Sequence, residues 1–160
     1  MSSEIVPHVE HIHVAEAKGA PVRALASAEA VAGAGLVGDR YARRQGLRRE
    51  GDESQDLTLI EAEAVEALLE SGIALAPGES RRNLTTRGVR LNDLVGKEFW
   101  IGEVLARGTE LCEPCSDLVA LTGKPLLRPL VHRGGLRADL LTSGRISVGD
   151  RIAVKDALPA

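Results

Sequence analysis

The segment that decides the fold is Glu98–Leu111, with the sequence EFWIGEVLARGTEL. A short β-type run ends at Ile101, Gly102-Glu103 follows, and a second apolar run begins at Val104, a pattern typical of two strands joined by a tight turn. The same phrase recurs at Arg145–Val154 as RISVGDRIAV, again with a glycine and an acidic residue between the two runs. These two segments predict two β-hairpins.

Periodicity predicts the elements that precede these hairpins. Val9–Val14 alternates and Asp56–Ile60 is a short β-type run, so both segments predict strands. Glu61–Ser71 predicts a helix that ends at Gly72, a residue suited to the position after a helix. Four apolar residues at helical spacing are expected to face the core: Ala62, Val65, Leu68 and Leu69. On the other face, water is expected to surround Glu63, Glu66 and Glu70. Short strands, glycine turns and few helices favour a mainly β fold, either a barrel or a closed sandwich.

Length and composition restrict the class of protein. The 160 residues, of which 44% are apolar and 27% charged, predict one globular domain over residues 1–160. The sequence has no uninterrupted apolar run of about 18 residues and no signal peptide, so we expect no membrane association and a cytoplasmic location. Aromatic residues make up 2% of the chain and the formal net charge is -3, which argues against nucleic-acid binding.

Arginine dominates the basic residues, with 16 Arg among the 20 Lys and Arg residues. Arginine binds carboxylates and phosphates through a fixed fork of donors. Three clusters occur along the chain: Arg40, Arg43, Arg44, Arg48 and Arg49; Arg81, Arg82, Arg87 and Arg90; and Arg128, His132, Arg133 and Arg137. The clusters are either solvated surface charge or parts of one anion site that meet in the fold. The first cluster lies in the polar stretch 40–56, which predicts a long mobile loop.

The two cysteines, Cys112 and Cys115, have the spacing CxxC and leave several interpretations open. A zinc site would need further ligands, for which His11 and His13 are candidates. A redox dithiol would be expected in a βαβ unit, which this sequence does not predict. Cys115 alone could be a reactive thiolate at the start of a short helix, 116–121, where the helix dipole favours ionisation. Two small buried thiols are the remaining alternative.

An ordered set of motifs carries a family resemblance. In chain order the segments are Gly38-Asp39-Arg40, Leu57-Thr58-Leu59-Ile60, Arg81–Val89, Leu91–Lys97, Ile101–Val104, Cys112–Cys115, Arg133–Ala138 and Val148-Gly149-Asp150. Together they resemble the MOSC domain, the module named after the C-terminal region of molybdenum-cofactor sulfurases. The resemblance covers a core of about residues 9–154. The chain departs from the family pattern at Arg82, where an acidic residue is expected, and at the extra glycine of Gly134-Gly135.

The resemblance implies a closed, distorted β-barrel with a few short helices, similar to the barrel domain of pyruvate kinase. It implies binding of the molybdenum cofactor (molybdopterin), with Cys115 as the catalytic residue and metal ligand. It also implies that the cofactor pocket is lined by Arg81, Asn83, Thr85, Arg87 and Arg133. The sequence has no motif for a pyridoxal-phosphate lysine, so we expect a stand-alone module without that cofactor.

The resemblance leaves three functions open. The first is a molybdenum-dependent oxidoreductase that reduces N-hydroxylated substrates and receives electrons from a donor protein. The second is a non-catalytic carrier that holds cofactor, or persulfide sulfur on Cys115 supplied by a cysteine desulfurase. The third is an interaction module whose arginines contact an acidic partner. The expected ligand is therefore a small-molecule cofactor or substrate, without nucleic acid or membrane.

Overall fold

The computed structural model describes residues 5–43, 56–114 and 116–155. The strands are β1 (His8–Ala15), β2 (Val22–Leu25), β3 (Ser27–Val31), β4 (Gly35–Leu36), β5 (Leu57–Glu61), β6 (Leu84–Arg87), β7 (Glu98–Ile101), β8 (Val104–Leu111), β9 (Leu136–Leu140), β10 (Gly144–Ser147) and β11 (Ile152–Val154). The helices are α1 (Arg40–Arg43), α2 (Ala62–Glu70), the 3-10 turn η1 (Leu91–Leu94) and α3 (Ser116–Thr122). The mainly β prediction is confirmed.

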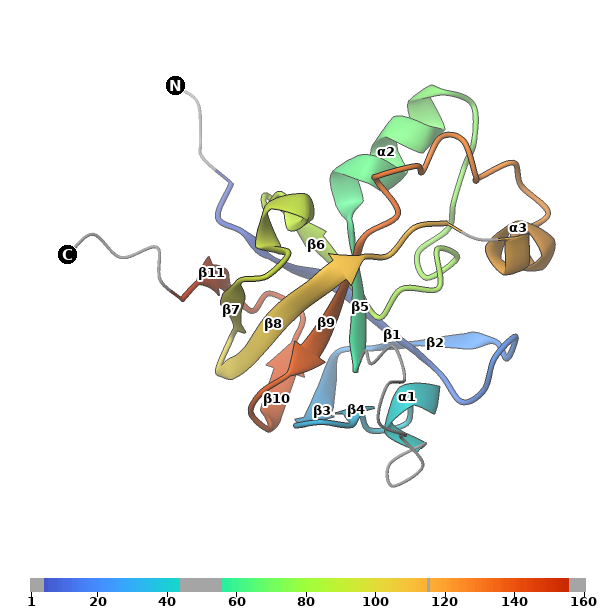
Figure 1. The fold of residues 1–160 in the computed structure, drawn as a ribbon. Helices are drawn as coiled ribbons and strands as arrows, with labels where there is room; N and C mark the ends of the chain where they lie inside the picture. The colour runs from blue at the N-terminus through green and yellow to red at the C-terminus, as the bar shows by residue number, and fades with distance from the viewer. Residues whose placement is uncertain (1–4, 44–55, 115, 156–160) are drawn as a thin grey trace.

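The strands form two sheets (Figure 1). The large sheet has eight strands in the order β11-β7-β8-β9-β5-β6-β1-β2, and the small one has the order β10-β3-β4. The large sheet is antiparallel except where β5 runs parallel to β6, with α2 as the first part of the connection between them. In Figure 1, α2 and α3 lie toward one end of the large sheet, and the small sheet lies toward the other.

The large sheet is an open half-barrel, so the prediction of a closed barrel is not confirmed. Its ladder of paired strands has two ends, β11 and β2. The second half of β1 pairs with β2 from Ile12 to Ala15, which leaves only the first residues of β1 for β11. There the contact is an isolated bridge between His8 and Arg151, not a ladder.

Aliphatic side chains fill the interior, as the scarcity of aromatic residues requires. Phe99 on β7 is fully buried among leucine, isoleucine, valine and alanine side chains of both sheets. A second, smaller cluster joins α2 to α3 and to the segment that follows α3: Leu68, Leu118, Leu126 and Leu130. This cluster fixes α3 beside α2, because each of its four side chains is buried against the others.

One of the two predicted hairpins is confirmed and the other is wrong. β7 and β8 pair in register from Glu98 with Arg107 to Ile101 with Val104. β10 and β11 both form, but β10 pairs with β3 and β11 pairs with β7. The turn between them is the reason: the N–H of Val148 donates to the Ala26 oxygen and that of Gly149 donates to the Val9 oxygen. The chain is therefore held by neighbouring segments as it passes from one sheet to the other.

The predicted strands 9–14 and 56–60 correspond to β1 and β5, and the predicted helix corresponds to α2. Gly72 follows this helix with φ +91°, as expected of the residue that terminates it. Two details differ. Leu69 is 61% exposed and not in the core. Glu63 is half-buried, because its Oε2 accepts a hydrogen bond from the N–H of Gly88 at 2.8 Å.

The predicted mobile loop 40–56 is wrong at its start, where residues 40–43 form α1, and at its end, where Asp56 is buried. Asp56 Oδ2 accepts a hydrogen bond from the N–H of Leu140 at 2.9 Å, which ties this residue to β9. The rest of that prediction, residues 44–55, lies outside the described residues. In the described part of the chain, no helix is both long and apolar enough to cross a membrane.

Candidate anion-binding cleft

A cleft of about 130 Å³ is lined by residues of α1, α3, β5 and β9 and by the segments that precede β2, precede β6 and follow β8. We call it the basic cleft, and its charged lining consists of Lys18, Arg40, Arg81, Arg82, Arg137, Glu113 and Asp117. Among the described residues of this lining, five cations and two carboxylates leave a formal excess of three positive charges, although the whole chain carries -3. Such a local excess attracts anions, because low-dielectric walls concentrate the field in a cleft.

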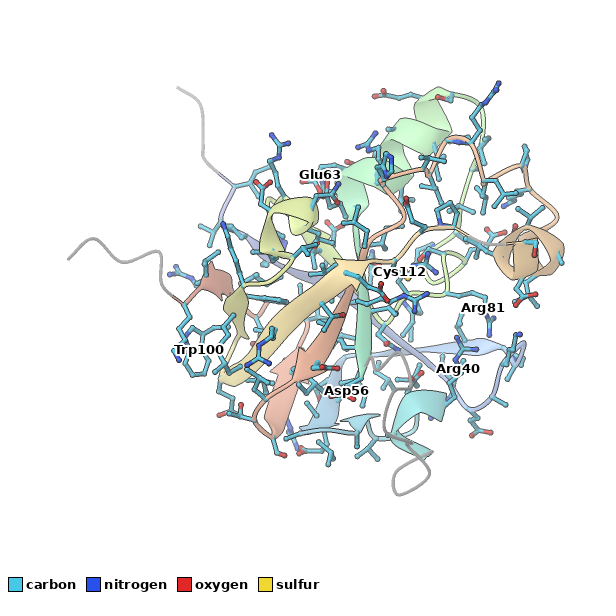
Figure 2. The ribbon with its side chains drawn as sticks, in the orientation of Figure 1. Arg40, Asp56, Glu63, Arg81, Trp100 and Cys112 are labelled. Atoms are coloured by element: carbon cyan, nitrogen blue, oxygen red, sulfur yellow. The ribbon has the colours of Figure 1, made fainter. Side chains whose placement is uncertain are left out.

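The basic cleft draws on all three arginine clusters of the sequence. Arg40 comes from α1, Arg81 and Arg82 precede β6, and Arg137 lies on β9. In Figure 2, Arg40 and Arg81 lie close together near the end of β8 at which Cys112 is found. The sequence left two alternatives for these clusters, solvated surface charge or parts of one site that meet in the fold. The members that line the cleft follow the second alternative.

Arg82 is the buried cation of the cleft, with 9% of its surface exposed. Its Nε donates to the Gly134 oxygen at 2.8 Å and its Nη2 to the Cys112 oxygen at 3.1 Å, with a longer contact from Nη1 to the Ser80 oxygen at 3.5 Å. All three acceptors are neutral carbonyls. The charge of Arg82 is therefore not cancelled by a carboxylate within the described residues, and it contributes to the positive potential of the cleft.

The two strand ends that Arg82 joins also approach each other directly. The N–H of Cys112 donates to the Gly135 oxygen at 2.8 Å. A Cβ on Gly134 would lie 2.3 Å from the Cys112 oxygen, and one on Gly135 would lie 1.9 Å from the Leu59 oxygen. Only glycine fits at these two positions. The Gly134-Gly135 pair, which departs from the family pattern by its extra glycine, therefore permits the backbone before β9 to pack closely against Cys112 and Leu59.

Arg81 has an unusual backbone conformation, with φ +62°, in the left-handed region that disfavours residues with a Cβ. Its Nη2 donates to the Ala20 oxygen at 2.7 Å, which anchors the loop before β2. Strained backbone of this kind persists only where the surrounding contacts fix it. Here the turn at Arg81 directs one guanidinium toward that loop and the next, Arg82, toward Cys112 and Gly134.

The segments on either side of Cys115 are held at the rim of the cleft. Glu113 accepts the backbone N–H of His132 at 2.7 Å and lies 2.9 Å from its Nδ1. Asp117, in the first turn of α3, pairs with Lys18 at 2.9 Å. The predicted helix after Cys115 is confirmed, since α3 begins at Ser116. Cys115 itself lies outside the described residues, and its assignment as catalytic residue and metal ligand stays a prediction.

The structure distributes the other predicted site residues over several places. Arg81 lines the basic cleft. Asn83 is buried beside it, where its Oδ1 accepts the Thr58 N–H at 3.0 Å and its Nδ2 donates to the His13 oxygen at 3.2 Å, so its side chain holds β1 and β5 together. Arg133 is exposed and lines neither this cleft nor the pocket described next.

Thr85 and Arg87 line a different pocket, between α2 and the strands β1 and β6. Arg87 forms ion pairs with Glu10 at 2.7 Å and with Glu66 at 2.8 Å. These contacts raise the pKa of Arg87, the Glu66 hydrogen bond most strongly, and use the guanidinium for pairs within the protein. The motif from Arg81 to Arg87 is thus divided between two cavities.

Four cationic residues of the cleft were not among the predicted site residues: Lys18, Arg40, Arg82 and Arg137. Three of them belong to the arginine clusters and lie within the segments that carry the family resemblance, but no local pattern distinguished them from the other members of their clusters. Lys18 belongs to no cluster and to none of these segments. The described residues contain no group of three or more His, Cys, Asp or Glu side chains able to hold a metal ion, but Cys115 lies outside them, so the zinc alternative for the cysteines stays untested.

The chain is similar to known proteins in sequence and in fold. The family model described as MOSC domain matches residues 46–153. No curated protein matches the sequence. Among solved structures, the YuaD protein from Bacillus subtilis is similar with a TM-score of 0.76 at 16% identity, covering 96% of this chain and 98% of that one. YiiM from Geobacillus stearothermophilus has a TM-score of 0.68 at 16% identity, covering 94% and 75%. YiiM from Escherichia coli has a TM-score of 0.65 at 15% identity, covering 95% and 71%.

Proposed function

The chain belongs to the MOSC domain family, and from this premise we propose that its basic cleft binds the phosphate-bearing molybdenum cofactor, molybdopterin. The single observation that carries the proposal is the convergence of four arginines and a lysine from distant parts of the chain on one cleft. Guanidinium groups suit a phosphate, because their planar donors match its oxygen atoms in pairs.

The donor set fits this ligand in a second respect. Arg82 is a buried cation whose hydrogen-bond acceptors are carbonyls, so a positive charge is already in place before any anion enters. A ligand anion here would meet a positive charge that the protein already holds in a fixed position, so the protein would need little rearrangement. The cleft volume of about 130 Å³ is sufficient for a phosphate group.

Cys115 is proposed to supply the thiolate that binds the metal. Residues on both sides of it in the sequence, Glu113 and Asp117, line the basic cleft. A thiolate is a suitable ligand for a soft metal centre. When bound, the cofactor would supply the redox chemistry for reducing an N-hydroxylated substrate, and the arginines of this chain would hold and orient it. A separate donor protein would then deliver the electrons.

The test is the molybdenum and pterin content of the protein purified from a host that makes the cofactor. We expect nearly stoichiometric amounts of both in the wild type. Arg137→Gln removes one charge from the lining and is expected to lower occupancy several-fold, because each charge-assisted phosphate contact contributes about 1–3 kcal/mol. Arg90→Gln is the matched control, since Arg90 is 86% exposed and does not line the cleft. Wild-type protein without pterin would refute the proposal, and so would equal losses in the two variants.

The carrier alternative is distinguished by mass. After incubation with a cysteine desulfurase and cysteine, a persulfide on Cys115 adds the mass of one sulfur atom to the intact protein. We expect Cys115→Ala to contain less molybdenum than the wild type and to retain the fold. A sulfur adduct on Cys115 in protein that never contains pterin would favour a sulfur carrier over a cofactor-binding protein.

A further inference from the structure

The pocket that contains Thr85 and Arg87 has no role in the function proposed above. Its volume is about 400 Å³, within the usual range for small-molecule sites, and it shares no lining residue with the basic cleft. We call it the α2 pocket, and it is lined by Glu10, His11, Ala62, Val65, Glu66, Leu75, Ala76, Pro77, Gly78, Ser80, Thr85 and Arg87. Three secondary-structure elements and the segment 75–80 contribute to it, so the pocket is built by the tertiary fold.

One wall of the α2 pocket carries a net negative charge. Arg87 donates to Glu10 through Nε at 2.7 Å and Nη2 at 3.2 Å, and to Glu66 through Nη1 at 3.1 Å and Nη2 at 2.8 Å. Every guanidinium nitrogen is engaged with a carboxylate. Two carboxylates around one guanidinium leave a formal charge of -1. The Arg87 hydrogen bond lowers the pKa of Glu66, so this carboxylate stays ionised at neutral pH.

The same wall has hydrogen-bond acceptors to spare. An ionised carboxylate offers about four lone-pair positions, and each oxygen of Glu10 and Glu66 uses one of its own for Arg87. Arg87 has no nitrogen outside this network to offer to a ligand anion. The wall is therefore suited to a ligand that donates hydrogen bonds and carries positive charge.

Thr85 is a polar group that faces this pocket without a partner. Its side chain is buried, with 7% exposed, and its hydroxyl makes no hydrogen bond within the described residues. The hydroxyl is not among the buried side-chain atoms that lack a partner, so it is accessible from the pocket, and a ligand could accept a hydrogen bond from it or donate one to it. His11, half-buried on β1, lines the same pocket and is the cross-strand partner of Thr85.

The remaining lining is apolar and suits a compact hydrocarbon body. Val65 and Ala62 of α2 contribute one side, and Leu75, Ala76 and Pro77 contribute another. We propose that the α2 pocket binds a compact organic amine with an apolar or aromatic body. Its amino group contacts Glu10 and Glu66, a polar atom reaches Thr85, and its body packs on the apolar side chains. Anions of the same shape are excluded by the net charge of the wall.

Three probes of one shape test the proposal: benzylamine, benzyl alcohol and benzoate. Binding to the full chain is followed by amide chemical shifts in two-dimensional NMR. We expect benzylamine to shift the resonances of Val65, Gly78 and Thr85 and to bind at least about ten-fold more tightly than benzoate, because the wall attracts one charge and repels the other. Benzyl alcohol is expected to lie between them.

Two variants locate the contacts. Glu66→Gln removes one charge from the wall, and Thr85→Val replaces the hydroxyl by a methyl group of similar size. Each is expected to weaken benzylamine about three- to ten-fold, the effect of losing one hydrogen bond or one nearby charge. Glu70→Gln is the matched control, because Glu70 is exposed on the same helix and does not line the pocket. Thermal unfolding of each variant verifies the fold.

The following results would overturn the proposal. One is that benzoate binds as tightly as benzylamine, which would show that the negative wall does not discriminate between a cation and an anion. Another is benzylamine shifts confined to residues outside the α2 pocket, or absent up to the solubility of the probe. A third is an equal loss of affinity in Glu66→Gln and Glu70→Gln. None of these results depends on the molybdenum or pterin content of the protein.

Discussion

Replacing Arg82 by methionine tests whether this buried cation fixes the segment that leads to Cys115. The substitution keeps an apolar stem and removes the guanidinium. Two well-formed charge-assisted hydrogen bonds are lost, at 2.8 Å to the Gly134 oxygen and at 3.1 Å to the Cys112 oxygen. The contact at 3.5 Å to the Ser80 oxygen is too long to contribute much.

The expected loss of stability follows from these contacts. Hydrogen bonds to a charged group contribute about 1.5–3 kcal/mol each, and two carbonyl groups are left without this donor. Removing the cation also removes the cost of burying it, which offsets part of the loss. A net decrease of about 2–4 kcal/mol in the free energy of unfolding is expected. For a domain of this size that corresponds to a lower melting temperature by roughly 5–15 °C.

The assay is urea and thermal unfolding followed by circular dichroism. Arg90→Met is the matched control, because Arg90 is 86% exposed and its contact to Asp93 is 3.7 Å long, so its loss is expected to change stability by less than about 0.5 kcal/mol. Arg82→Lys should fall between the two, since one ammonium group cannot reach both carbonyls in the same geometry. Equal stability of Arg82→Met and Arg90→Met would refute the reasoning.

Three further predictions concern the framework. Burial, followed by the charge of His11, lowers the pKa of His13 in the folded protein. The unfolded chain therefore binds the proton more readily, and the stability of the fold is expected to fall as the pH drops below about 6.5. The urea midpoint of His13→Leu should change less between pH 7 and 5 than that of the wild type. Gly135→Ala is expected to lower the free energy of unfolding by more than about 3 kcal/mol or to prevent folding, because a Cβ would meet the Leu59 oxygen of β5. The control Gly72→Ala is expected to cost roughly 1–2 kcal/mol, since its Cβ meets open space. Equal melting temperatures of the two variants would contradict the close approach of Gly135 to β5. Lys124→Met removes the ion pair to Glu79 at 2.7 Å and a hydrogen bond to the Ala74 oxygen, and is expected to cost about 1 kcal/mol at pH 7. Because the Lys124 hydrogen bond lowers the pKa of Glu79, this difference in unfolding free energy should decrease as the pH falls below about 4.5, leaving the contribution of the Ala74 contact.

Local signals predicted most of the elements. The β7–β8 hairpin follows from apolar runs around Gly102-Glu103, and α2 follows from helical spacing that ends at Gly72. Partner choice was not predictable in the same way. β10 and β11 have the same kind of sequence as a hairpin, yet tertiary hydrogen bonds at Val148 and Gly149 direct them to different sheets.

The candidate site, like the fold, could be predicted from the sequence only in part. The arginine clusters could be read from composition, but which member of each cluster faces the cleft depends on tertiary structure. Arg87 forms ion pairs with Glu10 and Glu66, which lie 77 and 21 residues away in the sequence, and no local sequence pattern predicts these pairs. Arg82 departs from the family pattern in sequence and is the cation most deeply built into the cleft.

The most direct test of the proposed cofactor site is X-ray absorption at the molybdenum edge, recorded on wild-type protein and on Cys115→Ser purified in parallel. The account predicts molybdenum in the wild type and one fewer sulfur neighbour of the metal in the variant. Identical sulfur coordination in the two proteins, or wild-type protein that acquires no molybdenum in a cofactor-producing host, would contradict it.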